Sequence, residues 1–433
     1  MSHHVFIGLT DVAGYFGSLA DGFRTLGVSC TVIDESPDFY QYRRISVHGR
    51  LGRAMVVAVD RSRRGPFRWV WGLVLLMLRT ARVPLRFFAL AVALGRCDVF
   101  IFTAGDGFLK GLELPLLKRM GKRIIWVFTG SDHRPPYLNG RYIRRAQREG
   151  WNHLAAESQR IAARVARVER HADVIVAHAA SAQFHKRSFV DFLALGIPVP
   201  VVGSVDEATI DDQSASPGRV RIMHCPSDLE SKGTAAIRRI IHSLIRDGLP
   251  VDYEEVLGRP HAEVLRALGR ADLLVDEVYG DTPMGVIASE AAAQGVPTVC
   301  GGYYATIVGA AGQDDDAPPS RFVVPEDLEA AIRELVIDGN RRASLGRAAR
   351  AFVTHRWDSA AVAGRYMRLL DGPVPPAWLL DPNALDYTGG WGISQAERRL
   401  ALSAFVAACG EQALALPPHS LVLDRVMAEV ASP

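Results

Sequence analysis

The hydrophobic positions in the first 200 residues fall into short apolar runs separated by stretches with helical spacing. The first run precedes a glycine-containing loop, an amphipathic stretch at 18–27 and a second apolar run, which is the pattern of a βαβ unit. The alternation continues and predicts strands at 4–10, 28–33, 98–103, 123–129, 173–178 and 198–203. Strands that alternate with helices indicate a mostly parallel sheet with helices on both faces.

The same rhythm restarts after VDEATIDDQSASP, an acidic, turn-rich stretch at 205–217 without apolar periodicity. It predicts strands at 220–225, 251–258, 271–276 and 297–301, separated by helices at about 234–247, from 261 and at about 285–294. We therefore predict an α/β fold of two Rossmann-like, doubly wound domains that face each other. Because open parallel sheets bind ligands at the carboxyl ends of their strands, the cleft between the domains is the expected site.

The predicted domain boundaries follow these changes of pattern. We expect an N-terminal Rossmann-like domain at 1–204, a linker at 205–218 and a C-terminal Rossmann-like domain at 219–370. Residues 371–433 begin with a Pro-rich break and end in a helix pair that starts at Ser394. We expect this helical extension to pack back on the N-terminal domain.

Charge is distributed unevenly along the chain, although its formal net value is only +3. Residues 1–205 hold 29 Lys and Arg against 15 Asp and Glu, and the remainder holds 21 against 32. A basic half suits an anionic partner such as nucleic acid, an anionic membrane surface or a phosphorylated substrate. No recognition-helix, RNP or zinc-finger pattern accompanies the charge, so we do not expect nucleic acid. Five scattered cysteines without a C-x-x-C pair favour a cytoplasmic chain.

The first candidate for anion binding is the loop between the first strand and the first helix. Gly14 and Gly17 allow the backbone to approach a ligand closely, and the helix N-terminus offers unpaired N–H groups. The spacing is not G-x-G-x-x-G, so a tight turn without a ligand is the alternative.

The strongest stretch is DTPMGVIASEAAAQGVPTV at 281–299. Gly285 leads into a helix whose N-terminus suits a diphosphate, and that helix carries Glu290 among alanines. A carboxylate in such a setting is costly to bury without partners, and ribose hydroxyls would serve. A surface ion pair is the alternative. Lys232, just before the next domain's first helix, is placed to reach a phosphate, or else is simply solvated.

These stretches together resemble the GT-B glycosyltransferases, and specifically the retaining glycosyltransferase family 4. The resemblance rests on Lys232-Gly233, on the Glu290-AAAQGVP segment, on the strand at 271–276 and on the Trp-containing helix at 355–370. It covers most of residues 1–370 in layout and is specific only in about 219–302. It implies transfer of a sugar from a nucleoside-diphosphate-sugar to a hydroxyl acceptor with retention, and no cofactor besides the donor. It also implies that 1–204 is the acceptor domain and 219–370 the nucleotide-sugar donor domain.

By this resemblance, Lys232 holds the donor diphosphate and Glu290 the ribose. The loop that contains Thr282 and Gly285 would contact the donor sugar and phosphates, and Gly258 would lie near the base. The chain departs from the family pattern at two positions. Thr282 replaces the first glutamate of E-x7-E, and Ser227 replaces the arginine that precedes the lysine. A nucleotide-sugar epimerase on the same fold and a non-catalytic nucleotide-sugar-binding scaffold are the alternatives.

Acceptor chemistry is expected where strands of the first domain end. The segment GSDHRPPY brings Asp132, His133 and Arg134 to one strand end, and Asp106 follows an earlier strand. We assign Asp106, Asp132 and His133 as candidate catalytic residues and Arg134 as an acceptor-binding residue. A local ion pair between Asp132 and Arg134 is the alternative. The only D-x-D, at 314–316, lies in a turn-rich stretch, and we expect no metal site there.

The segment from 61 to 96 carries eight arginines and no acid, interleaved with apolar runs at 69–78 and 87–94. These runs are about half the roughly 20 residues needed to cross a bilayer. An interfacial amphipathic pair on an anionic membrane, at its inner face, fits the composition. Core helices with solvated arginines are the alternative. The expected partners are thus a nucleotide-sugar donor, a glycan or lipid-linked acceptor and an anionic membrane surface.

Overall fold

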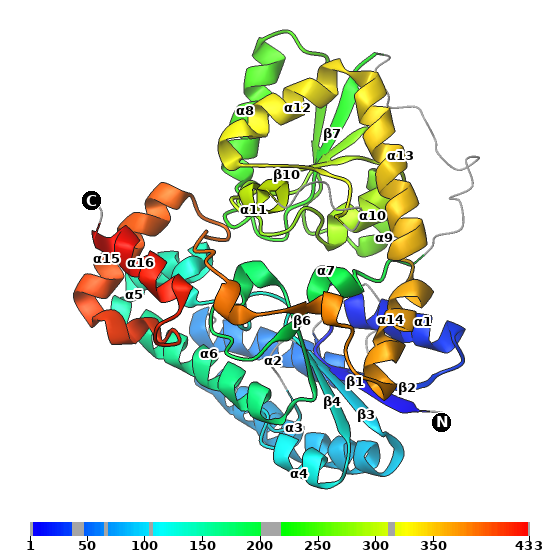
Figure 1. Cartoon of the computed structure of the whole chain (residues 1–433), viewed down its shortest axis with the longest axis vertical. Helices are drawn as coiled ribbons and strands as arrows, with labels where there is room; N and C mark the ends of the chain where they lie inside the picture. Colours follow the sequence, from blue (N-terminus) through cyan, green and yellow to red (C-terminus); the bar gives the residue numbers. More distant parts are fainter. Residues whose placement is uncertain are drawn as a thin grey trace.

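Two parallel β-sheets, each covered by helices, form the two halves of the molecule (Figure 1). The computed structural model describes residues 3–36, 47–64, 68–103, 107–200, 218–310 and 317–431. The predicted α/β fold with two Rossmann-like halves is confirmed. Asp106, the linker residues 205–217 and the acidic run 314–316 lie outside the described residues.

The first sheet has seven strands in the order β12-β6-β5-β4-β3-β1-β2. Its strands are β1 (His4–Leu9), β2 (Ser29–Asp34), β3 (Val99–Thr103), β4 (Arg123–Val127), β5 (Val174–Ala177), β6 (Phe189–Asp191) and β12 (Leu379–Leu380). All neighbours are parallel except β12, which runs antiparallel to β6. The chain reverses its direction of growth at β1, which lies between β2 and β3, and such switch points open a crevice at the strand ends.

Helices cover both faces of this sheet. They are α1 (Tyr15–Thr25), α2 (Val47–Arg64), α3 (Arg68–Arg96), α4 (Leu114–Arg119), α5 (Gly140–Glu149), α6 (Trp151–His171) and α7 (Phe192–Leu195). Every residue of β3 is buried, as its unbroken apolar sequence requires of a strand covered on both faces. α2 and α3 pack against each other as a long hairpin.

The second sheet has five parallel strands in the order β11-β10-β9-β7-β8. They are β7 (Val220–His224), β8 (Val251–Glu255), β9 (Leu273–Val275), β10 (Thr298–Gly301) and β11 (Arg321–Val323). Its helices are α8 (Thr234–Arg246), α9 (His261–Leu268), α10 (Val286–Ala293), α11 (Ala305–Ala310), α12 (Leu328–Ile337) and α13 (Gly339–Arg356). The switch point here is β7, between β8 and β9, and its strand end faces the first half.

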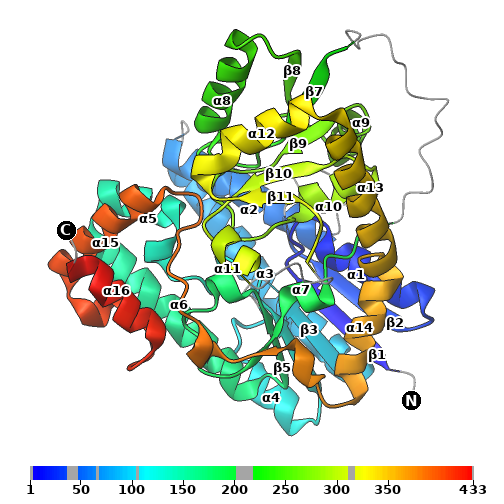
Figure 2. The same cartoon turned by 45° about the horizontal axis from the view of Figure 1, so that its top comes forward.

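The chain then crosses back to the first half (Figures 1 and 2). α14 (Ser359–Asp371), which the sequence placed with the second domain, packs against α1, and β12 joins the first sheet. α15 (Gln395–Cys409) packs on α6, and α16 (Leu421–Ala431) packs on α15. Ser394 starts α15 with a capping box, in which its hydroxyl accepts from the Glu397 N–H.

One predicted strand is wrong in the part of it that the structure describes. Of the run at 198–203, Val199 makes only an isolated bridge to Asp358, and the last strand before the linker is instead β6. β6 is three residues long and carries Asp191, which caps α7 by accepting the Leu193 N–H, so the apolar pattern was too short to detect. None of the described helices has the length and apolar character to cross a membrane.

Candidate functional site

Two adjoining cavities lie between the halves, with volumes of about 290 and 220 Å³. Both are lined by Tyr15, Ile197 and Val286, so they form two chambers of one cleft. The smaller chamber is reached by loops that follow β1, β4, β5 and β9, which are carboxyl strand ends of both sheets. The cleft therefore lies where parallel sheets place their ligands.

The larger chamber contains the predicted residues Gly14 and Glu290. Glu290 is buried, and its Oε1 lies 2.7 Å from Nε2 of His261, which also lines this chamber. Its Oε2 is buried and has no hydrogen-bond partner among the described residues. A carboxylate with one oxygen held and the other open can accept hydrogen bonds from a polar ligand such as a ribose diol.

The N-terminus of α1 does not present its amide groups to this chamber as expected. Asp11 accepts hydrogen bonds from the N–H groups of Phe16 and Gly17, both at 3.0 Å. A carboxylate already occupies the position that an anionic ligand would take, because negative charge is favoured at a helix N-terminus. Gly14 adopts a left-handed conformation (φ 77°) and borders the cavity, whereas Gly17 has its amide engaged.

The N-terminus of α10 is open by comparison. Gly285 precedes the helix in an extended conformation, and no side chain caps its first turn. Thr282, Gly285 and Val286 line the smaller chamber. Unpaired N–H groups at a helix start attract phosphate groups, so this end of the cleft suits a diphosphate.

Arg134 and Asp281 form an ion pair between the two halves inside the smaller chamber. Their side chains are only 6% and 7% exposed, and the Arg134 guanidinium also lies 5.8 Å from the ring centroid of Trp391. Burial raises the pKa of Asp281, although Arg134 opposes that effect. Arg134 thus reaches the second domain rather than pairing with Asp132.

Lys232 lies beside the smaller chamber and is bound by two carboxylates. Its Nζ is 2.7 Å from Asp276 Oδ1 and 3.2 Å from Glu277 Oε2. Burial lowers the pKa of the ammonium, but the two carboxylates outweigh burial and raise the pKa. Burial raises the pKa of Glu277, which itself lines the chamber. The lysine charge is therefore largely neutralised by protein groups.

The same carboxylates, together with Cys300, form a cluster of metal-ligand type whose donor atoms lie within 4.8 Å of one another. The Lys232 ammonium already contacts both carboxylates. A cation at this position would have to displace the lysine, because both positive groups compete for the same oxygens. The two carboxylates are therefore accounted for by their ion pairs with Lys232.

Asp132 is half-buried in the loop after β4, with its Oδ2 atom buried. Its Oδ1 accepts the Thr129 N–H at 3.0 Å, and its backbone carbonyl accepts from Arg164. Burial raises the pKa of Asp132 to about 6. Thr129 and Gly130, rather than Asp132, line the smaller chamber.

His133 is fully buried, and both of its ring nitrogens have partners. Nε2 lies 3.0 Å from Ser181 Oγ, and Nδ1 lies 3.0 Å from Nε2 of His185, whose Nδ1 faces Glu169 at 3.2 Å. Burial holds the pKa of His133 well below its ordinary value, so the ring stays neutral. His133 does not line the smaller chamber itself, but it is linked to it through Ser181.

Other predicted residues lie away from the two chambers. Ser227 is exposed in the loop after β7, and Gly258 follows β8 with φ +60° and open space around it. Neither belongs to the walls of either chamber.

Among the wall residues of the smaller chamber that sequence reasoning missed are His178, Ser181 and Trp391. Nδ1 of His178 accepts the Ala180 N–H, and burial lowers the pKa of His178 to about 4, so its single proton is on Nε2. Trp391 comes from the C-terminal extension, where the run TGGWG was a glycine signal for close backbone approach. The N–H of its neighbour Gly392 donates to Tyr279 O of the second domain.

Comparison with solved structures agrees with this architecture. A structure of the trehalose-6-phosphate synthase OtsA aligns with a TM-score of 0.51 at 11% identity, over 86% of this chain and 100% of that one. The chain has the GT-B fold. Anabaena Alr3699/HepE in complex with UDP and glucose matches at 12% identity over 86% and 100% of the two chains, with a TM-score of 0.48.

The glycosyltransferase SnogD from Streptomyces nogalater matches at 15% identity over 86% and 100% of the two chains, with a TM-score of 0.39. No protein-family model and no curated protein matches the sequence. The GT-B fold accounts for the position of the two chambers, because it places the carboxyl ends of two separate sheets opposite each other.

Proposed function

We propose that the protein is a glycosyltransferase that moves a sugar from a nucleoside-diphosphate-sugar to a hydroxyl acceptor, with retention at the anomeric carbon. One observation carries the proposal: an uncapped helix N-terminus and a half-satisfied buried carboxylate of the same helix, α10, both border the interdomain cleft. These two groups suit a diphosphate and a ribose, respectively. Retention and the role of α10 also follow from the resemblance to family 4.

The donor would span both chambers. Its ribose would lie at Glu290 in the larger one, its diphosphate at the start of α10, and its sugar in the smaller one near Arg134 and Trp391. The shared wall residue Val286 begins α10, so the two chambers meet where the diphosphate is expected.

Stabilisation of the leaving diphosphate would come from the α10 dipole and not from a metal. The dipole places about half a positive charge at the helix start, inside a cleft where water is excluded. Lys232 would contribute through the donor hydrogen atoms that Asp276 and Glu277 leave free. Ser227, which replaces the expected arginine, is exposed and neutral, so it adds no charge.

On the acceptor side, we propose that His133 acts through Ser181 as a positioning residue. Because the Glu169 carboxylate faces Nδ1 of His185 at 3.2 Å, we assign the proton of each neutral ring to Nδ1, so that His185 donates to Glu169 and His133 donates to Nε2 of His185. His133 Nε2 then accepts from the Ser181 hydroxyl, which orients that oxygen toward the smaller chamber. The Ser181 oxygen can in turn accept a hydrogen bond from an acceptor hydroxyl, a sugar hydroxyl of a glycan or a lipid-linked glycan.

A donor screen by thermal shift, followed by binding titration, tests the proposal. A bound nucleotide-sugar raises the melting temperature, because it stabilises the folded state by RT ln(1 + [L]/Kd), where [L] is the concentration of free ligand. Glu290→Gln should weaken donor binding by about 10- to 100-fold, because it removes a charged hydrogen-bond acceptor worth about 1.5–3 kcal/mol. The exposed Glu411→Gln is the matched control. Equal affinity in Glu290→Gln and wild type would refute the placement of the donor.

Product analysis separates the rival functions. Transfer to an added acceptor, with retained configuration, supports the glycosyltransferase. Interconversion of two nucleotide-sugars without an acceptor would identify an epimerase. Tight donor binding with no turnover of any donor would identify a binding scaffold.

A further inference from the structure

α3 presents a continuous apolar face to solvent. Its exposed large side chains recur every three or four residues, so they lie on one side of the helix. They are Trp69, Val70, Leu73, Leu76, Met77, Val83, Phe87 and Phe88, with exposed fractions between 37% and 71%. We call this set the α3 stripe. Soluble proteins rarely expose apolar surface that is both this continuous and this large in its members.

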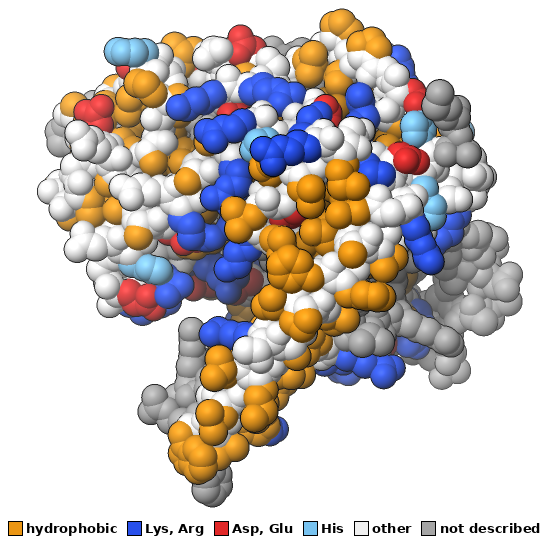
Figure 3. All heavy atoms as spheres, turned by 90° about the horizontal axis from the view of Figure 1, so that it is seen from below, with side chains coloured by type: hydrophobic (Ala, Val, Ile, Leu, Met, Phe, Trp, Pro, Cys, Tyr) orange, Lys and Arg blue, Asp and Glu red, His pale blue; other side chains and the backbone are white. Residues whose placement is uncertain are grey.

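A helix that covers a sheet buries its apolar side, whereas α3 exposes the α3 stripe to solvent. The intervening positions Val74, Leu75 and Leu78 are half-buried, and α3 packs its inner side on α2. Only the last turns of α3 enter the core, through Ala89, Leu90 and Ala93. Figure 3 shows hydrophobic side chains gathered in a band that runs out along a part projecting from the body.

The charged side chains that the structure describes as exposed on α3, and Arg61 of α2 beside it, are positive. Arg61 and Arg79 are exposed, and the guanidinium carbon of Arg61 lies 4.5 Å from the ring centroid of Trp71, so this charge stacks on an aromatic ring at the surface. No acidic residue occurs between 61 and 97. Figure 3 also shows Lys and Arg side chains on the body beside the apolar band.

The positive charges indicate which kind of partner covers the α3 stripe. A symmetric dimer would place two copies of the same basic segment against each other, with no acid in it to pair with. An anionic bilayer offers both an apolar interior for the stripe and phosphates for the arginines. We propose that the α3 stripe docks the protein on the surface of an anionic membrane, with α3 lying in the interface.

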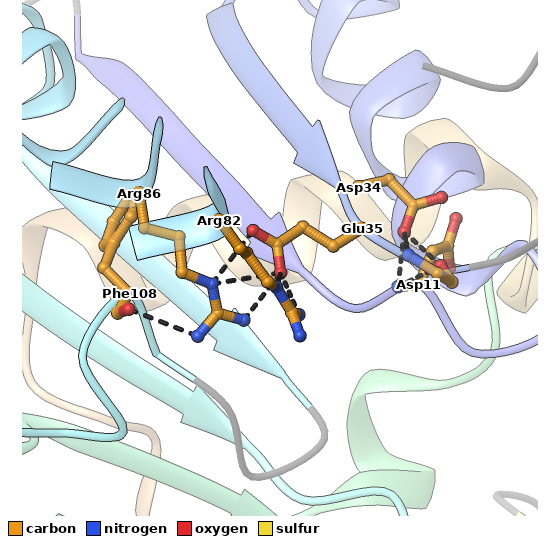
Figure 4. Close-up of polar contacts among 7 residues, drawn as sticks. Asp11, Asp34, Glu35, Arg82, Arg86 and Phe108 are labelled. Carbon is orange, nitrogen blue, oxygen red and sulfur yellow. Dashed lines mark hydrogen bonds and ion pairs between the residues drawn. The ribbon is translucent and has the colours of Figure 1, made fainter. Parts of the chain in front are cut away.

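The base of α3 is fixed to the cleft side of the first sheet (Figure 4). Glu35, directly after β2, is buried and accepts from Nε of Arg82 at 2.9 Å and from Nε and Nη2 of Arg86 at 3.0 and 2.6 Å. Arg86 also donates to Phe108 O at 3.2 Å. These two arginines are therefore structural, and they make the hairpin a rigid extension of the sheet.

The same anchor reaches the cleft. Glu35 N donates to Leu9 O, and the neighbouring Asp34 accepts from the N–H of Asp11, one residue before Val12 in the wall of the smaller chamber (Figure 4). A membrane that binds the α3 stripe would thus lie on the same side of the first domain as the proposed acceptor site. This last step rests on the proposed function and specifies an amphiphilic, lipid-linked acceptor; the docking does not depend on it.

Flotation with lipid vesicles tests the docking. The full chain should float with vesicles of phosphatidylcholine and phosphatidylglycerol, and much less with phosphatidylcholine alone or at high salt. Leu73→Gln with Met77→Gln should lower vesicle binding at least about tenfold, because two large apolar side chains no longer enter the interface. Arg79→Gln should weaken binding only to the anionic vesicles. Ile337→Gln with Leu400→Gln, which changes two equally exposed apolar residues on other helices, is the matched control.

Equal flotation of the Leu73/Met77 variant and wild type would overturn the proposal, as would wild type that does not float at all. A wild-type dimer that this variant turns into a monomer, without vesicle binding, would instead identify a second copy as the occupant. Unchanged melting temperatures establish that the variants are folded. Donor binding is measured on the same samples: donor binding without flotation refutes only the docking, and flotation without donor binding refutes only the proposed transfer.

Discussion

Replacing Lys232 by methionine tests whether this lysine neutralises the protein's own carboxylates or serves only a ligand. The change keeps the apolar stem and leaves Asp276 and Glu277 buried beside each other without a cation. Removing one partner of a buried ion pair typically costs about 3–5 kcal/mol of unfolding free energy. We expect a loss of that size at pH 8 in the Lys232→Met variant.

The loss should depend strongly on pH. In wild type the pKa of Lys232 is raised, so the stability from its charge is fully present below the ordinary pKa and is lost as pH rises from that value through the raised one. Without the ammonium, the two carboxylates share one site and the folded state retains a proton that the unfolded chain releases. Stability should then fall by about 1.4 kcal/mol per pH unit, or nearly 3 kcal/mol between pH 6 and pH 8.

Urea denaturation at pH 6, 7 and 8, followed by circular dichroism, measures this slope. Lys186→Met, at an exposed lysine, should follow wild type at all three values. The triple variant Lys232→Met, Asp276→Asn, Glu277→Gln should lose this pH slope, because neither carboxylate that contacts Lys232 in wild type remains to titrate. A single variant whose slope equals that of wild type would refute the reasoning. Donor affinity measured in the triple variant then reports the ligand role of the lysine apart from its role in stability.

Two further changes test buried groups outside this cluster. Because burial raises the pKa of Asp132 to about 6, the stability that its protonated carboxyl contributes should be lost as pH rises from about 4 to 6, so the difference in stability between wild type and Asp132→Asn should change by up to roughly 3 kcal/mol over that range in denaturation curves. A Cβ on Gly22 would lie 2.0 Å from Ser359 O, so Gly22→Ala should separate α14 from α1 and lower the melting temperature by several degrees. Gly364→Ala in α14, with nothing within 4 Å of the added atom, should raise it slightly; equal effects would refute the packing argument.

The sequence predicted the parts of the cleft that local pattern determines. Apolar runs located most strands, and the segments after them supplied Arg134 and Gly285 in loops and Glu290 in a helix, because a parallel sheet puts every such connection at one edge. The strands that were missed are short: β6 and β11 have three residues each and β12 has two. β9 is as short as β6, but it lies within the apolar run at 271–276 and was predicted.

The contact partners of those residues could not be predicted from the sequence, because these contacts depend on how distant segments of the chain pack. Arg134 meets Asp281 only when the two halves close on each other. Trp391 enters the cleft because the C-terminal extension passes between the halves, with Gly392 N bonded to Tyr279 O. A local pattern specifies which edge of a sheet a side chain occupies, and tertiary packing specifies what it meets there.

The two glycine-containing βα loops show the same limit in one comparison. Both place a glycine before a helix at a cleft-facing strand end, so the pattern alone gives them equal claim to a phosphate. The two loops differ because of Asp11, whose carboxylate accepts hydrogen bonds from the N–H groups of Phe16 and Gly17. This carboxylate balances the partial positive charge at the N-terminus of α1. The α10 loop carries an acid at a similar spacing, Asp281, but that carboxylate pairs with Arg134, and no side chain caps the start of α10. A glycine loop is therefore a candidate anion site only when the acids near it are bound elsewhere, and of these two loops the α10 loop meets that condition.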